Sequence, residues 1–76
     1  MIERTLRMTY DPVADAAYIY IADPILAGEA VRTAMVDSAL DAAALTLDFD
    51  LNNRLLGIEL LGVSRLLRPD AIPAKE

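Results

Sequence analysis

The fold is decided by the stretch Leu45-Thr46-Leu47-Asp48-Phe49-Asp50-Leu51-Asn52-Asn53-Arg54-Leu55-Leu56-Gly57-Ile58-Glu59-Leu60-Leu61. Large apolar side chains occupy every second position on both sides of its centre, which is the period-two pattern of a half-buried strand. Asparagine tolerates the positive φ that a tight turn requires. The stretch therefore predicts a β-hairpin with strands at residues 43–49 and 55–61 and a turn at 51–54. Gly57 inside the second strand predicts a bulge or a close approach of another group to the backbone.

The sequence before this hairpin predicts three further strands. Alternation at residues 5–10 and 16–21 indicates two strands, and Asp11–Asp15, with a proline and two aspartates, is typical of the turn between them. A less regular alternation predicts a strand at 29–36. Residues 37–44 fit either one capped helical turn or a polar connection, and we favour the connection.

The sequence after the hairpin predicts one short helix. Ser64 can cap a helical turn that holds Leu66 and Leu67 and ends at Arg68-Pro69. We expect residues 70–76 to be frayed. Together these elements predict a single α+β domain over residues 1–76, with an ordered core at about 5–68. Its sheet has four to five antiparallel strands in a meander-like order, followed by the C-terminal helix.

Composition and charge narrow the classes of partner. The 76-residue chain has a net charge of −5, which repels nucleic acid and anionic membranes. No apolar run approaches the roughly 20 residues needed to cross a bilayer. A chain of this size buries only about 60% of its surface on folding, so its stability is marginal and a second copy would help. We expect a cytoplasmic homodimer that binds neither nucleic acid nor membrane.

Two segments resemble a known family. Residues 8–12 (Met-Thr-Tyr-Asp-Pro) with 14–19 (Ala-Asp-Ala-Ala-Tyr-Ile) form one half of the likeness. The other half is residues 48–50 (Asp-Phe-Asp) with 54–61 (Arg-Leu-Leu-Gly-Ile-Glu-Leu-Leu) and Ser64. This pair is similar to the DUF2283 family of small bacterial and archaeal proteins, over about residues 6–67. The resemblance implies a compact antiparallel sheet with a short C-terminal helix, and it transfers no catalytic residues. The family usually has an acidic residue and glycine where this chain has Asn52-Asn53.

The same hairpin raises the question of a divalent metal. Asp48, Asp50, Asn52 and Glu59 have the spacing of ligands at positions 1, 3, 5 and 12 of a calcium loop, so Ca²⁺ or Mg²⁺ is a candidate ligand. Asn53 stands where such a loop requires glycine, and strands rather than helices flank the site. We therefore favour a plain hairpin with solvated carboxylates.

Other chemistry is limited by the residues present. The chain has no histidine and no cysteine, which excludes zinc centres and histidine-based triads within it, and we expect no enzyme. Tyr18 and Tyr20, with Arg32 nearby, could form a stacking platform for a ligand or a partner, and we favour the alternative that they pack against the C-terminal helix or a second subunit. We expect a non-enzymatic, self-associating protein-interaction module, in a concrete version an antitoxin-like protein that neutralises a small basic protein. The alternative is a small-ligand or divalent-metal protein that uses the Asp48–Glu59 hairpin.

Overall fold

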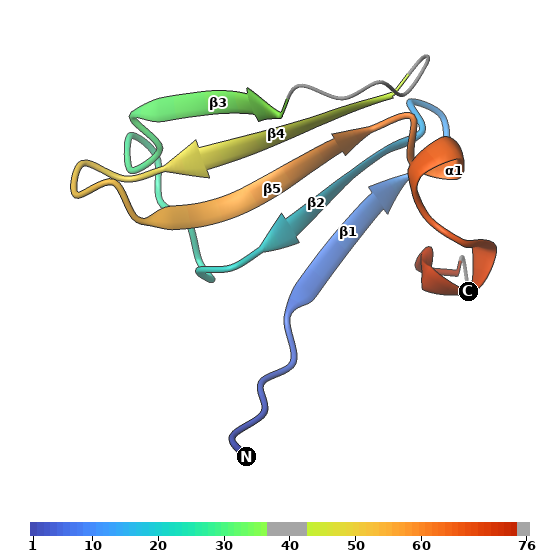
Figure 1. The fold of residues 1–76 in the computed structure, drawn as a ribbon, viewed down its shortest axis with the longest axis horizontal. Coiled ribbons are helices and arrows are strands. Elements are labelled where there is room, and N and C mark those ends of the chain that lie inside the picture. The colour runs from blue at the N-terminus through green and yellow to red at the C-terminus, as the bar shows by residue number, and fades with distance from the viewer. Residues whose placement is uncertain (37–42, 75–76) are drawn as a thin grey trace.

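The computed structural model describes residues 1–36 and 43–74, which form one five-stranded antiparallel sheet followed by two short helical segments (Figure 1). The elements are β1 (Arg7–Asp11), β2 (Ala16–Tyr20), β3 (Arg32–Val36), β4 (Ala44–Phe49), β5 (Leu55–Leu61), the α-helix α1 (Val63–Leu66) and the 3-10 helix η1 (Pro69–Ala71). The predicted α+β class is confirmed, and the hairpin strands agree with the prediction to within one residue. The predicted connection at 37–44 lies largely outside the described residues.

The strand order is β1-β2-β5-β4-β3, so the sheet is not quite the predicted meander. β2 pairs with β5 rather than with the next strand in the chain, and residues 21–31 carry the backbone to β3 at the far edge. Burial gives the physical reason, because β5 holds buried Leu56, Gly57 and Leu60 and is stabilised by a neighbour on each side. β3, which is exposed at four of its five positions, lies at an edge.

The prediction for Gly57 is confirmed in both respects. One extra residue of β5 lies between the pairs Asp48 with Gly57 and Phe49 with Leu55, which is a β-bulge. The ring of Tyr18 lies directly over Gly57, so that a Cβ atom at this position would come within 2.5 Å of ring carbons Cε2 and Cζ. Glycine is thus required here for space.

Asp15 positions the start of α1. Its backbone carbonyl accepts hydrogen bonds from the N–H groups of Gly62 and Val63, both at 3.0 Å. Its carboxylate accepts a bond from the Ser64 hydroxyl at 2.7 Å and another from the Ser64 N–H. Ser64 therefore lies inside the helix and is held by Asp15, whereas the N-cap residue is Gly62, at φ 74°. This corrects the predicted cap.

The closed part of the core is small. Among the described residues, the buried apolar side chains are Ala17, Leu56, Leu60 and Val63. α1 contributes Val63, which is fully buried against Ala17 and Leu60. Ile72, in the C-terminal segment that we expected to be frayed, also packs against this cluster. The helical segments thus cover the sheet at one end, beside β1, as Figure 1 shows.

Candidate functional site

The two faces of the sheet differ in chemistry. Strand register places Ala34 opposite Leu47 and Leu47 opposite Ile58, and it places Val36 opposite Leu45 in the same way. Directly opposed residues of an antiparallel sheet share a face, so these five side chains form one patch across β3, β4 and β5. We call Ala34, Val36, Leu45, Leu47 and Ile58 the open apolar face.

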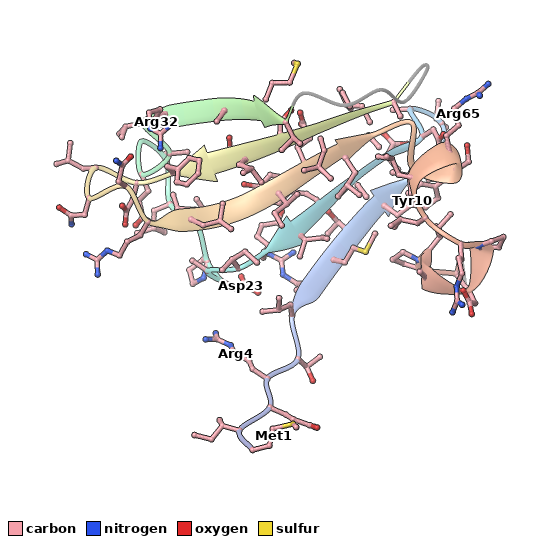
Figure 2. The ribbon with its side chains drawn as sticks, viewed as in Figure 1. Met1, Arg4, Tyr10, Asp23, Arg32 and Arg65 are labelled. Carbon is pink, nitrogen blue, oxygen red and sulfur yellow. The ribbon has the colours of Figure 1, made fainter. Side chains whose placement is uncertain are left out.

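The open apolar face continues the core toward β3: Leu45 and Ile58 pack against the buried cluster, and the other three residues lie on β3 and β4. It lies on the same side of the sheet as the buried cluster, because Leu45 pairs with Leu60. None of its five residues is buried, and Val36 is 39% exposed. In Figure 2 the described helical segments stand beside β1, and they do not cross β3 or β4. The β3 and β4 part of the sheet's apolar side is therefore without a covering helical segment among the described residues.

The overall dimensions agree with this arrangement. The chain exposes 5856 Å² of solvent-accessible surface, whereas a compact monomer of this mass exposes roughly 4,600 Å². Its radius of gyration is 13.2 Å, against about 11.4 Å for a compact domain of this length. The extended residues 1–6 contribute to both differences.

The opposite face, called the polar face below, carries polar side chains that are cross-linked by contacts, together with the exposed side chains of Met35 and Leu61. The Tyr18 hydroxyl donates a hydrogen bond of 2.8 Å to Asp48, which also accepts one of 2.9 Å from Thr33. Burial of the Tyr18 hydroxyl, followed by its bond to the Asp48 carboxylate, raises the pKa of Tyr18 well above its usual value. This phenol stays neutral at physiological pH and acts as a donor, so the network ties β2, β4 and β3 together.

An arginine also lies beside a tyrosine on this face, but it is Arg7 and not the predicted Arg32. The guanidinium of Arg7 lies 3.7 Å from the centroid of the Tyr20 ring, and it forms two hydrogen bonds with Asp23. The bond to Arg7 lowers the pKa of the Asp23 carboxyl. Tyr20 in turn packs edge-on against Tyr18, with ring centroids 4.8 Å apart. Tyr18 and Tyr20 therefore lie together in one cluster, and their role in binding a partner stays a prediction.

Arg32 does not belong to that cluster. It begins β3, which β4 and β5 separate from β2. Its guanidinium lies 4.2 Å from the centroid of the Phe49 ring, and Asn53 accepts two hydrogen bonds from it. Register places Arg32 and Phe49 on the apolar side of the sheet, at its corner (Figure 2). The prediction that Arg32 joins the tyrosines is wrong, because the unexpected strand order moves β3 to the far edge.

The predicted metal ligands are separated by the hairpin. Asp50 faces its own turn, where its Oδ1 accepts bonds from the N–H groups of Asn52 and Arg54, both at 2.9 Å. Asp48 is held by the polar-face network described above. Glu59 lies in mid-strand on β5, opposite Tyr18 and Thr46. Within residues 1–36 and 43–74 no three acidic side chains gather closely enough to hold a metal ion.

The turn itself forms as the sequence indicates. Asn53 has φ 63° and donates its N–H to the Asp50 carbonyl at 3.0 Å. The aspartate of the first turn behaves in the same way, because Asp11 accepts bonds from the N–H groups of Val13 and Ala14. The favoured reading of residues 48–59 as a plain hairpin is therefore consistent with the hydrogen bonds of its turn.

One contact was beyond sequence reasoning. Asp15 and Ser64 are 49 positions apart, and local patterns assign each a separate local role. The bond to Ser64 lowers the pKa of the Asp15 carboxyl, while the bond to Asp15 raises the pKa of Tyr10. The sequence linked Asp15 and Ser64 in one way only, because both lie in the segments that carry the family resemblance.

Comparison with known proteins gives a family but no function. The family model described as a protein of unknown function (DUF2283) matches residues 7–64 of the chain. The protein belongs to this family. Neither curated proteins nor solved structures gave a match. Among the described residues no helix has the length and apolar content needed to cross a membrane.

Proposed function

We propose that this member of the DUF2283 family is a non-enzymatic protein-interaction module whose working form is a homodimer. The observation that supports the proposal is the open apolar face. A soluble sheet normally keeps one face wet and buries the other, and here the described helical segments pack on one end of the apolar face only. A second copy supplies the missing layer without any other component.

The exposed surface of the chain is larger than that of a compact monomer by about 1,250 Å², and part of this excess belongs to the extended residues 1–6. A standard interface takes about 800 Å² from each partner. Large exposed apolar patches on small domains mark interaction sites. Dimerisation would bring the buried area of each chain toward the usual value.

The acidic character of the chain gives the dimer an exterior suited to a basic protein. The net charge is −5, and Asp48 and Glu59 both lie on the polar face, away from the proposed contact between copies. Opposite charges raise the rate of encounter between partners, and this effect is screened by salt. An antitoxin-like role toward a small basic protein is one form of this function.

Sedimentation equilibrium of the purified full-length chain tests the proposal. We expect a mass of twice the 8.3 kDa chain at micromolar concentration, since interfaces of standard size give affinities from roughly micromolar to picomolar. A mass of 8.3 kDa at every concentration would overturn the proposed homodimer. A separate thermal melt with millimolar Ca²⁺ or Mg²⁺ examines the alternative, because bound metal would raise the unfolding temperature by mass action.

A further inference from the structure

We infer that residues 62–74 form a releasable cover, held on the sheet by Asp15, and that this cover opens while the five strands stay paired. We call residues 62–74 the C-terminal cover. It contains α1 and η1 and stands beside β1 at one end of the sheet (Figure 1). The inference concerns a movement within one chain, so it holds for a monomer as well as for the proposed homodimer.

The hydrogen bonds that join the C-terminal cover to the rest of the described chain all end on Asp15. Its backbone carbonyl accepts bonds from the N–H groups of Gly62 and Val63. Its carboxylate accepts bonds from the N–H and the hydroxyl of Ser64. Other hydrogen bonds of the cover stay within it, such as the bond from the Leu67 N–H to the Val63 carbonyl. One residue therefore makes the polar attachment between cover and sheet.

The backbone of Asp15 suits it to this attachment. Its φ is 52°, in the left-handed region that aspartate enters more readily than most residues. In this conformation its carbonyl and its carboxylate both reach the successive N–H groups at the start of the cover. The first N–H groups of a helix have no partner inside the helix, and the N-cap residue Gly62 has no side chain to supply one. Asp15 supplies these acceptors from 49 positions away.

The apolar attachment of the C-terminal cover is small. Val63 is the one buried residue of α1 and η1, and it packs against Ala17 and Leu60. Three more apolar side chains of the cover pack at the margin of this cluster and stay half-buried: Leu66, Leu67 and Ile72. A helix of four residues is not stable by itself in water. The cover therefore depends on Asp15 to stay folded in its place.

The sheet is held together by contacts that do not involve the C-terminal cover. Each strand pairs with one or two neighbours, and the hydrogen-bond network of the polar face joins three of the strands. Opening of the cover leaves these contacts in place. It exposes Ala17 and Leu60, and Leu60 lies opposite Leu45 of the open apolar face. The cover therefore controls how much of the sheet's apolar side reaches solvent.

Hydrogen exchange of the full-length chain, followed by NMR, tests the inference. The reporters are the amides of Gly62, Val63 and Ser64, and the reference is the set of paired amides in the middle of β5. Local opening exchanges amides at a rate that low urea does not change, whereas urea accelerates exchange through global unfolding. We expect the reporters to exchange at least about tenfold faster than β5, at a rate insensitive to low urea. Equal rates with equal urea dependence would overturn the inference, because cover and sheet would then open together.

Asp15→Gly and Asp11→Gly provide a matched pair of variants. Each removes one carboxylate from the same turn, and glycine adopts the φ of Asp15 without strain. Asp11 bonds to Val13 and Ala14 within the turn. Asp15→Gly should accelerate exchange of the reporter amides roughly ten- to hundredfold, because it removes hydrogen bonds to a charged group. The β5 amides should keep their rate.

Two results with these variants would contradict the inference. One is acceleration of the β5 amides by the same factor as the reporters, and the other is an equal effect of Asp11→Gly on the reporters. If Asp15→Gly does not fold, Ser64→Ala serves in its place, because it removes only the hydroxyl that donates to Asp15. It should still accelerate exchange at Gly62 and Val63 several-fold, and unchanged exchange there would also overturn the inference.

Discussion

Replacing Gly57 by alanine tests the close packing of the polar face. The new Cβ would lie within 2.5 Å of the Tyr18 ring carbons, where contacts of 3.4–4 Å are ordinary. The ring must therefore move by about 1 Å, and overpacking of this kind costs roughly 1–3 kcal/mol. Movement also strains the 2.8 Å hydrogen bond from the Tyr18 hydroxyl to Asp48, which adds roughly 0.5–1.5 kcal/mol. We expect Gly57→Ala to lower the free energy of unfolding by about 1.5–4.5 kcal/mol.

A double-mutant cycle isolates this cause. With Tyr18→Ala as the background the Cβ has space, and Gly57→Ala should then stabilise the protein by about 0.5–1 kcal/mol through reduced entropy of the unfolded chain. The assay is urea unfolding followed by circular dichroism at one protein concentration. Gly28→Ala is the control, because Gly28 has φ 84° in open space and its loss should not depend on Tyr18. An equal loss for Gly57→Ala in both backgrounds would refute the reasoning.

Three further predictions concern the core, the helix anchor and the polar network. Leu60→Ala should cost about 2–5 kcal/mol in urea unfolding, whereas Leu61→Ala, at a 42% exposed neighbour, should cost under about 1 kcal/mol. The hydrogen bond to Ser64 lowers the pKa of the Asp15 carboxyl from its ordinary value of 3.8. The stability that ionised Asp15 gives to the folded chain is therefore complete above that ordinary value, and it is lost as the pH falls through the lowered pKa of the folded state. The urea midpoint of the wild type should therefore fall more steeply below about pH 4 than that of Asp15→Asn, and parallel curves would contradict this. Tyr18→Phe should cost about 0.5–1.5 kcal/mol in unfolding free energy, because it removes one hydrogen bond, and no change would indicate that water replaces it.

The strands could be predicted because the alternation of apolar residues that indicates a strand lies within one short segment. Residues 55–61 alternate clearly, and β5 has those bounds. β3 alternates less clearly and begins at Arg32, three residues later than predicted. Its exposed edge position explains this, since a strand with few buried side chains needs no strict apolar alternation.

Strand order and long-range contacts were not predictable in the same way. Nothing in a single alternating segment says that β5 will insert between β2 and β4, and the position of Arg32 depended on that order. The same limit applies to the anchoring of α1 by Asp15. The predicted tyrosine pair came together because Tyr18 and Tyr20 lie on one strand, where spacing alone decides the face.

The open apolar face, by contrast, combines both kinds of information. The small size of the chain predicts marginal stability, which led us to expect a homodimer. Only the register showed which residues are left uncovered, because it places Ala34, Leu47 and Ile58 side by side on three strands. The location of the uncovered part beyond α1 also required the structure.

The central claim is that a second copy completes this fold, and the concentration dependence of unfolding tests it most directly. Urea midpoints are measured for the full-length chain over a hundredfold range of protein concentration. If folding and dimerisation are linked, each tenfold increase in concentration stabilises the dimer by about 1.4 kcal/mol, so the midpoint should rise steadily. A midpoint that is the same at every concentration would show that the single chain is the complete folding unit and would contradict the account.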